Sequence, residues 1–242
     1  MSALAVETMA ERVHALDWPA IEAALDGQGF AKLPAVLDQA ECELLAGLYP
    51  QGARFRSRID MSRFRFGVGE YKYFAAPLPP IVTTMREEIY ARLAPIANQW
   101  KVRLKPDTTE TYPAHVRGFL ARCHAAGQTR PPLLLSYAAG GYNCLHQDIY
   151  GDLVFPLQAV FALSRAGADY QGGEFILVEQ RPRAQSRAHA IPLEQGSGLV
   201  FATRERPVRG TRGDYRATMR HGVSTVTAGS RMTLGLIFHD AR

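Results

Sequence analysis

Three side chains whose types and spacing suit metal binding stand out in the sequence of 242 residues: His146, Asp148 and His221. His146 and Asp148 are two positions apart, so in a β-strand their side chains point from the same face. Two imidazoles and one carboxylate form the facial triad that suits non-haem Fe(II), because three ligands on one side of the ion leave the other positions open for substrate and O₂. An H-x-D pair arises readily by chance, so this prediction depends on the residues around it.

Arg231 is the second residue whose surroundings predict chemistry. It follows His221 by ten positions across an expected turn at 227–230, so the two residues can lie on adjacent antiparallel strands. Arg231, Thr233 and Gly235 would share one face of the last strand, while the apolar residues between them face the core. A buried arginine needs an anionic partner, because an unpaired buried charge is strongly unfavourable. We therefore expect a dicarboxylate that chelates the iron at one end and contacts Arg231 and Thr233 at the other.

These side chains need a β-rich scaffold, and the second half of the chain has the matching pattern. Short β-branched and aromatic runs separated by glycine, proline and polar turns predict a double-sheet jelly roll, hence an α+β, mainly β fold. Helical spacing and capping residues predict N-terminal helices packed outside it. The expected helices are 18–27, 39–48, 80–100 and 113–126, and the expected strands are 29–33, 133–137, 142–147, 153–163, 173–178, 198–203, 215–219, 222–226 and 231–239.

Composition excludes several classes of protein. Hydrophobic residues make up 47% of the chain and charged residues 21%, which is typical of globular proteins and excludes disorder, collagen and coiled coil. The N-terminus lacks the pattern of a signal peptide, and no window approaches the ~18 apolar residues of a membrane span. Three widely spaced cysteines predict reduced thiols. We expect a soluble, cytoplasmic protein that makes no membrane contact.

The positive charge is concentrated in two arginine-rich segments. The net charge is +5, yet residues 51–75 carry a net +4 and residues 181–220 a net +6. The first segment alternates arginine with phenylalanine from Arg54 to Phe66, which predicts a hairpin that turns around 59–62. Such a surface fits a polyanion or an acidic peptide, although solvated arginines above inward-packed phenylalanines give the same pattern. The predicted substrate rim consists of Arg54, Arg56, Arg65, Arg181 and Arg183.

Residues 133–239 resemble the Fe(II)/2-oxoglutarate-dependent dioxygenases. The resemblance rests on His146-x-Asp148, His221 and Arg231-x-Thr233, in the order and spacing of that superfamily. It implies a double-stranded β-helix core at 131–242, with the N-terminal helices and basic hairpin of 1–130 forming part of the same domain. It also implies that the triad holds Fe(II), that Arg231 and Thr233 bind the distal carboxylate of 2-oxoglutarate, and that Tyr137 reaches this co-substrate. The sequence is equally consistent with Tyr137 being an aromatic residue of the buried core.

The same resemblance implies a reaction. O₂ and 2-oxoglutarate are consumed, succinate and CO₂ are released, and a substrate C–H bond is hydroxylated. The carboxylate of Asp148, which related halogenases lack, favours hydroxylation over halogenation. His146, Asp148, His221 and Arg231 would then be the catalytic residues.

The motifs point to two possible substrates, of which we expect a protein or peptide side chain, with alkylated nucleic-acid bases as the alternative. The pattern H-x-V-x-x-V-x-x-G-x-R-x-x-L at 221–234 and the G-G-E-F run at 172–175 are similar to prolyl-hydroxylase-like enzymes and favour a protein or peptide side chain. The approach to the triad from Tyr137 is similar to AlkB-type dealkylases of alkylated nucleic-acid bases, although Ile237 stands where those enzymes carry a second arginine. Two further alternatives involve no turnover: a metal-binding cupin and a nucleic-acid binder that relies on charge alone.

Overall fold

The computed structural model describes residues 7–129, 132–149 and 151–240 of the chain. The α-helices are α1 (Met9–His14), α2 (Trp18–Gln28), α3 (Gln39–Gly47), α4 (Pro80–Leu104) and α5 (Val116–Ala125), and two 3₁₀ turns are η1 (Gly52–Arg54) and η2 (Met61–Phe64). Helices α2 to α5 agree with the predicted ranges within a few residues, whereas α1 was not predicted. Asp38 begins α3 in a capping box with Glu41, as its sequence indicates. The expected boundary at 130/131 falls outside the described residues.

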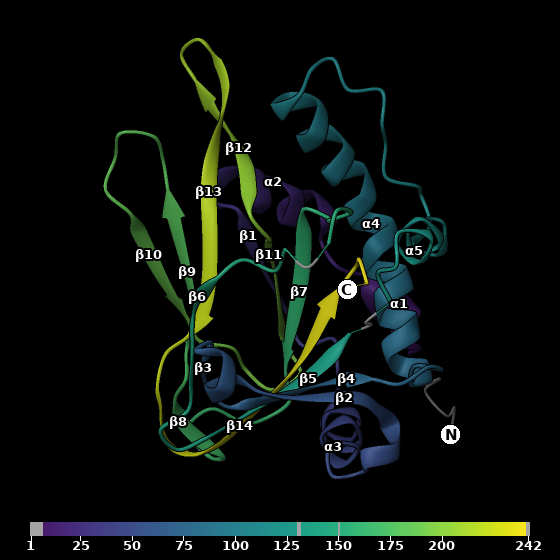
Figure 1. Cartoon of the computed structure of the whole chain (residues 1–242), viewed down its shortest axis with the longest axis vertical. Coiled ribbons are helices and arrows are strands. Elements are labelled where there is room, and N and C mark those ends of the chain that lie inside the picture. The colour runs from purple at the N-terminus through teal and green to yellow at the C-terminus, as the bar shows by residue number, and fades with distance from the viewer. Residues whose placement is uncertain (1–6, 130–131, 150, 241–242) are drawn as a thin grey trace, which may run out of the picture.

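The strands form two antiparallel sheets that face each other as a double-stranded β-helix (Figure 1). The larger sheet has the order β1-β11-β7-β14-β5-β4-β2 with β8 paired to β14, and the smaller sheet has the order β10-β9-β13-β6-β3 with β12 paired to β13. The predicted mainly β fold is confirmed. The strands are β1 (Phe30–Leu33), β2 (Phe55–Asp60), β3 (Gly67–Val68), β4 (Glu70–Phe74), β5 (Leu133–Ala138), β6 (Tyr142–His146), β7 (Leu157–Ala162), β8 (Tyr170–Gly172), β9 (Phe175–Gln180), β10 (Arg187–Ile191), β11 (Gly198–Ala202), β12 (Glu205–Gly210), β13 (Gly213–Val223) and β14 (Val226–Ile237).

The topology brings distant residues into register. Within the larger sheet, β14 lies between β5 and β7, and Arg231 is the register partner of Tyr137. Within the smaller sheet, β13 pairs with β6 and places His221 opposite His146. Residues separated by more than 70 positions in the sequence therefore become cross-strand neighbours.

Helices cover the outer face of the larger sheet, and Figure 1 shows α4 as the longest of them. Apolar residues of α4 and of β14, including Leu93 and Leu234, belong to one buried core. Arg86 of α4 fastens the end of β14: its Nε donates to the carbonyl of Ile237 at 3.0 Å, and its guanidinium pairs with Asp240 at 2.7 Å. None of the described helices has both the length and the apolar character needed to cross a membrane.

The segment 55–74 joins both sheets, which differs from the predicted hairpin. Strand β2 forms near its expected place, but its partner is β4 and not residues 63–66. Asp60 caps the 3₁₀ turn η2 by accepting hydrogen bonds from Ser62, and Arg65 then adopts a left-handed conformation with φ of 59°. These local contacts break the alternation, so β3 pairs with β6 of the smaller sheet.

The C-terminal strands are longer than predicted. The strand expected at 215–219 and the first two residues of the strand expected at 222–226 belong to one continuous strand, β13. The chain turns at 224–225, and β14 already begins at Val226, so the expected turn at 227–230 is wrong. Strands β10 and β12 were not predicted, because their mixed, arginine-containing sequences lack a clear apolar alternation.

Candidate metal centre and co-substrate cavity

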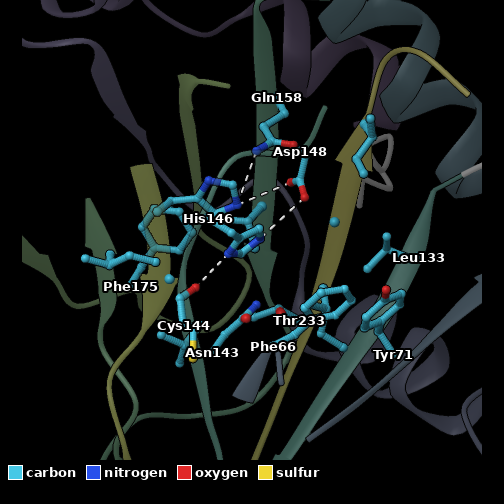
Figure 2. A pocket seen from close by; sticks show the side chains of 18 of the residues that line it. Phe66, Tyr71, Leu133, Asn143, Cys144, His146, Asp148, Gln158, Phe175 and Thr233 are labelled. Carbon is cyan, nitrogen blue, oxygen red and sulfur yellow. Dashed lines mark hydrogen bonds and ion pairs between the residues drawn. The ribbon is translucent and has the colours of Figure 1, made fainter. Parts of the chain in front are cut away.

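The three predicted metal ligands meet inside the barrel (Figure 2). His146 ends β6, Asp148 follows by two residues, and His221 lies on β13. Asp148 Oδ1 lies 3.4 Å from Nε2 of His146, and Asp148 Oδ2 lies 3.3 Å from Nε2 of His221. One ligand atom from each residue lies within 4.8 Å of the others, so the cluster can hold a single metal ion.

Local contacts orient both imidazoles. Nδ1 of His146 lies 2.8 Å from the carbonyl oxygen of Cys144, so a proton on Nδ1 donates to this oxygen and leaves the Nε2 lone pair facing the cluster. His221 is packed against the rings of Phe175 and Phe201, at centroid distances of 5.7 and 4.8 Å. Among the described residues, Nδ1 of His221 has no hydrogen-bond partner. Ring packing, and not a second hydrogen bond, therefore fixes this ligand.

Burial and charge act on the three ligands in opposing directions. Burial alone would raise the pKa of Asp148, but the charges and hydrogen bonds of His221 and His146 hold that pKa well below its usual range. Burial lowers the pKa of His221, and His146 lowers it further. Burial would lower the pKa of His146 as well, but its hydrogen bond and attraction to Asp148 raise it. A carboxylate and two imidazoles on one side of a cavity fit a divalent ion such as Fe(II).

Arg231 lies at another part of the same cavity and is only 2% exposed. Its Nε has no hydrogen-bond partner within the described residues. Its positive charge makes only a minor contribution to the lowered pKa of Glu174, whose carboxylate accepts a hydrogen bond from Ser224. Thr233 is on the same face of β14 and is 1% exposed. Because a buried guanidinium with an unsatisfied donor is unfavourable, this position fits the distal carboxylate of 2-oxoglutarate.

Tyr137 lies beside Arg231 and is fully buried. The Cζ atom of Arg231 is 5.7 Å from the centre of the Tyr137 ring, and the Tyr137 hydroxyl accepts a hydrogen bond from Asn143 at 3.3 Å. Burial raises the pKa of Tyr137 to about 12, so the hydroxyl keeps its proton at neutral pH and can donate to a bound anion. Its position fits both a packed aromatic and a co-substrate contact.

A cavity of about 380 Å³ connects the triad with Arg231. Arg231, Thr233 and Gly235 face this cavity, while Leu234 and Leu236 lie in the main core, so the predicted alternation along β14 is confirmed. The apolar wall comes from the adjoining strands of the larger sheet. Its residues are Tyr71, Tyr73, Leu133, Leu135 and Ile237.

Of the five predicted rim arginines, Arg65 alone lines this cavity. Arg56 donates to the carbonyl of Thr129, and Arg181 pairs with Glu179. The remaining two, Arg54 and Arg183, are exposed on the surface. The two basic segments therefore do not form a single rim around the cavity.

The sequence prediction did not include Gln158 among the cavity residues. Gln158 is an amide within β7, whose other residues are apolar and buried, and that lone polar residue was the available signal. Phe66, which belongs to the predicted arginine and phenylalanine surface, lines the cavity and is 40% exposed, so it does not pack inward as the alternative for that pattern expected. Exposed Arg65, Phe66 and Leu145 mark where the cavity opens to solvent.

Comparison with protein families finds one family model that matches residues 69–241, described as "Oxygenase, catalysing oxidative methylation of damaged DNA" and named Oxygenase-NA. Uncharacterized proteins from two strains of Mycobacterium tuberculosis are 51% identical over 169 residues, which cover 69% of this chain and 72% of each relative.

Solved structures with a similar fold share low sequence identity. A prolyl-4-hydroxylase from Pseudomonas putida is 14% identical with a TM-score of 0.51, and the match covers 93% of this chain and 99% of that one. An oxidoreductase of the 2OG-Fe(II) oxygenase family from Burkholderia pseudomallei is 17% identical with a TM-score of 0.53, covering 93% and 91%. These likenesses confirm the double-stranded β-helix fold.

Proposed function

The chain belongs to the Oxygenase-NA family of Fe(II)- and 2-oxoglutarate-dependent oxygenases, and we propose that it removes alkyl groups oxidatively from damaged bases of single-stranded DNA. The protein is thus an oxidoreductase that uses Fe(II), 2-oxoglutarate and O₂. This reaction class sets aside the cupin and the nucleic-acid binder without turnover. The identity of the substrate is the part of this function that we propose.

The roles proposed for the cavity residues follow from their chemistry. His146, Asp148 and His221 would hold Fe(II), and Arg231 with Thr233 would bind the distal carboxylate of 2-oxoglutarate. The hydroxyl of the neighbouring tyrosine on β5 would donate to the same co-substrate. Bound Fe(II), 2-oxoglutarate and O₂ supply the oxidation, in which the co-substrate becomes succinate and CO₂ and one oxygen atom enters a substrate C–H bond. The protein binds and orients the reactants, and its apolar wall excludes water.

An alkyl group on a base nitrogen suits this oxidation. One oxygen atom of O₂ enters a methyl C–H bond and the other enters succinate, while loss of CO₂ from 2-oxoglutarate supplies two electrons. The resulting N-hydroxymethyl group breaks its C–N bond, releases formaldehyde and leaves the base nitrogen with a proton. Because none of these reactants carries a methyl group to transfer, we write the reaction on damaged DNA as removal of the methyl carbon.

The observation that carries this proposal is an exposed aromatic pair beside an arginine at the cavity mouth. Phe64 and Phe66 stack with ring centroids 5.5 Å apart and remain 54% and 40% exposed. Arg65 stands between them in the sequence and lines the cavity. Aromatic faces can stack on bases and arginine can contact phosphate, and together they favour a single strand with one base turned into a pocket.

Hydroxylation of a peptide side chain is the second candidate, favoured by the prolyl-hydroxylase-like pattern. Several residues of these motifs pack around Arg231 and its neighbour Tyr137. Gly173 has φ of 65°, and a Cβ there would lie 2.9 Å from Cδ of Arg231, while Val223 and Val226 pack with Tyr137. The pattern therefore bears on the co-substrate end of the cavity more than on the substrate, and we prefer damaged DNA.

We also propose a cytoplasmic location. The three cysteines Cys42, Cys123 and Cys144 are free, and Cys144 is exposed. Free thiols persist in a reducing compartment, where DNA is also accessible.

Succinate release tests the choice of substrate. With Fe(II), 2-oxoglutarate and O₂ present, a single-stranded oligonucleotide with N-methylated bases should raise the rate at least about tenfold over the unmethylated oligonucleotide. A proline-containing peptide should leave the rate at background. Stimulation by the peptide alone would move the assignment to the second candidate.

A further inference from the structure

A buried amide faces the metal triad without a role in the assignments above. Gln158 lies on β7, is 2% exposed and lines the cavity. The other residues of β7 are apolar and buried. An amide buried among apolar groups is unfavourable unless its hydrogen bonds are satisfied, so Gln158 needs a partner inside the cavity.

The amide of Gln158 contacts a histidine nitrogen that would itself bind the metal, so metal binding would end this hydrogen bond. The amide nitrogen lies 3.4 Å from Nε2 of His221, and this His221 Nε2 atom lies 3.3 Å from Oδ2 of Asp148. When Nε2 of His221 binds a metal, it carries no proton and its lone pair is occupied. This nitrogen can then no longer form a hydrogen bond with Gln158, and the amide becomes free to bind another group beside the metal.

The position of Gln158 along the cavity identifies that group. On β7, Gln158 is the register partner of Ile237, whereas Ala162 is the partner of Thr233. Figure 2 shows Gln158 beside Asp148, while Thr233 lies farther along the cavity. Because the Gln158 amide contacts Nε2 of His221, which faces the triad, the end of a dicarboxylate that binds the metal would lie near Gln158, while Arg231 would hold its distal end.

We propose that Gln158 is a co-substrate-binding residue whose amide donates a hydrogen bond to the metal-bound carboxylate of 2-oxoglutarate. A hydrogen bond from an amide to a carboxylate is charge-assisted, and it would satisfy a donor that metal binding leaves free. The inference rests on the triad and Arg231 assignments of the proposed function, and it is independent of the choice between DNA and peptide.

Equilibrium binding of 2-oxoglutarate to the Fe(II)-loaded protein without O₂ tests this inference. Gln158→Leu keeps the approximate size of the side chain and removes its hydrogen bonds. We expect its affinity for 2-oxoglutarate to fall about tenfold or more, while its affinity for Fe(II) stays within about twofold of the parent. Gln158→Met is the second variant if Gln158→Leu does not fold, and thermal unfolding of each variant checks this.

Two controls separate this role from a structural one. The amide of Gln195 donates to the carbonyl of Leu163 at 2.9 Å and does not line the cavity, so Gln195→Leu should bind 2-oxoglutarate like the parent. The second control is 2-oxobutyrate, a 2-oxo acid without the distal carboxylate. Gln158→Leu should weaken both acids by the same factor, whereas Arg231→Leu should weaken only the dicarboxylate.

Three outcomes would overturn the inference. The first is 2-oxoglutarate affinity within about twofold of the parent in Gln158→Leu at equal Fe(II) occupancy. The second is a loss of Fe(II) affinity in this variant, which would make Gln158 a positioning residue for His221. The third is weaker binding of 2-oxoglutarate with unchanged binding of 2-oxobutyrate. Because no DNA or peptide is present, a failure of the substrate proposal would leave these results interpretable.

Discussion

At the scale of single residues, two buried charges differ in how they are satisfied. Asp148 lies between two imidazoles, and their interactions keep its pKa well below the usual range despite burial. Arg231 is 2% exposed, and its Nε lacks an acceptor among the described residues. A buried charge that is left unpaired costs folding free energy. Arg231 is thus best explained by a ligand that supplies the missing negative charge.

Replacement of Arg231 by leucine should separate stability from co-substrate binding. Without 2-oxoglutarate, Arg231→Leu should unfold at a temperature equal to or above that of the parent, because it removes an incompletely paired buried charge. With metal present, 2-oxoglutarate should raise the unfolding temperature of the parent and leave that of the variant unchanged. A normal rise in the variant would show that Arg231 does not bind the co-substrate.

Removal of one metal ligand should weaken metal binding far more than removal of another histidine. We expect His221→Ala to lower Fe(II) affinity at least about a hundredfold, since the loss of a direct ligand exceeds that of its supporting hydrogen bonds. His189 contacts Phe30 and lies outside the cavity, so His189→Ala serves as the matched control. Equal Fe(II) affinities in the two variants, measured by anaerobic titration, would contradict the triad assignment.

The triad and Arg231 were predictable because each depends on residue type and short spacing. The i and i+2 positions of His146 and Asp148 place both on one side of the chain. His221 and Arg231 follow in the expected order, but β13 and β14 belong to opposite sheets, so the expectation that these two residues lie on adjacent strands is wrong. Gln158 was not predictable in this way. Its significance depends on the distance to His221, which only the pairing of β6, β9 and β13 and their packing against β7 determine.

At the scale of elements, the segment 55–74 connects the scaffold to the cavity mouth. Strands β2 and β4 extend the larger sheet and β3 joins the smaller one, so η2 is held where the two sheets meet. Alternation predicted β2, but it could not predict the pairing of β4, because the cap at Asp60 and the left-handed Arg65 interrupt the period. Long-range pairing then decides which strand becomes the partner.

Removal of the Phe66 ring at the cavity mouth should weaken binding of the substrate without changing binding of 2-oxoglutarate. We expect Phe66→Ala to raise the KM for methylated single-stranded DNA about tenfold, as base stacking on an aromatic side chain contributes about 1–3 kcal/mol. The Kd for 2-oxoglutarate should not change. Leu44 on α3 is 57% exposed and does not line the cavity, so Leu44→Ala is the control. An unchanged KM in Phe66→Ala would remove η2 from the substrate site.

Arg65→Ala should act through charge at the same mouth. Because arginine contacts to phosphate release counterions, the variant should bind DNA less tightly at low salt and show a shallower decrease in affinity as salt rises. Fluorescence anisotropy at several salt concentrations measures this slope. A slope equal to that of the parent would show that Arg65 makes no phosphate contact.

A buried ion pair between elements should control stability in acid. Glu179 of β9 pairs with Arg206 of β12 at 2.6 Å, and Arg206 also donates to the carbonyls of Asp26 and Gly27 at the end of α2. Glu179→Gln should lower the free energy of unfolding by about 2 kcal/mol at neutral pH, below the cost of a fully orphaned charge because Arg206 keeps its carbonyl acceptors.

The pH dependence of this pair has a defined sign. Burial would raise the pKa of Glu179, but hydrogen bonds and charges from Arg181 and Arg206 lower it below its usual value. Its stabilisation is therefore complete above the unfolded pKa and is lost as pH falls through the lower folded pKa. Urea unfolding from pH 7 downward should show the parent approaching Glu179→Gln. A constant difference between the two across this range would contradict the assignment.

At the scale of the whole molecule, the arginine excess serves the fold as well as the surface. The chain has a net charge of +5 and two segments with most of its positive charge. Several arginines form ion pairs that join distant elements, and Arg65 alone among the predicted rim residues lines the cavity. Overall charge therefore supports attraction to a polyanion, while selection of the substrate depends on the few residues at the mouth.

The sequence patterns predicted the double-sheet fold and the triad, but not how the N-terminal half completes the barrel. The apolar runs within residues 133–239 were enough to predict the jelly roll. By contrast, β1, β2 and β4 extend the larger sheet through pairings with distant strands. Such pairings depend on register and packing across the whole domain, which local alternation does not contain.

The most direct test of the account is the mass of the DNA product. A single-stranded oligonucleotide with one N-methylated base should be incubated with the protein, Fe(II), 2-oxoglutarate and O₂. We predict loss of the methyl group from the oligonucleotide, with one formaldehyde and one succinate formed for each base restored. His221→Ala should give none of these products. An oligonucleotide that keeps its methyl group, under conditions in which the parent binds Fe(II) and 2-oxoglutarate, would contradict the proposed activity.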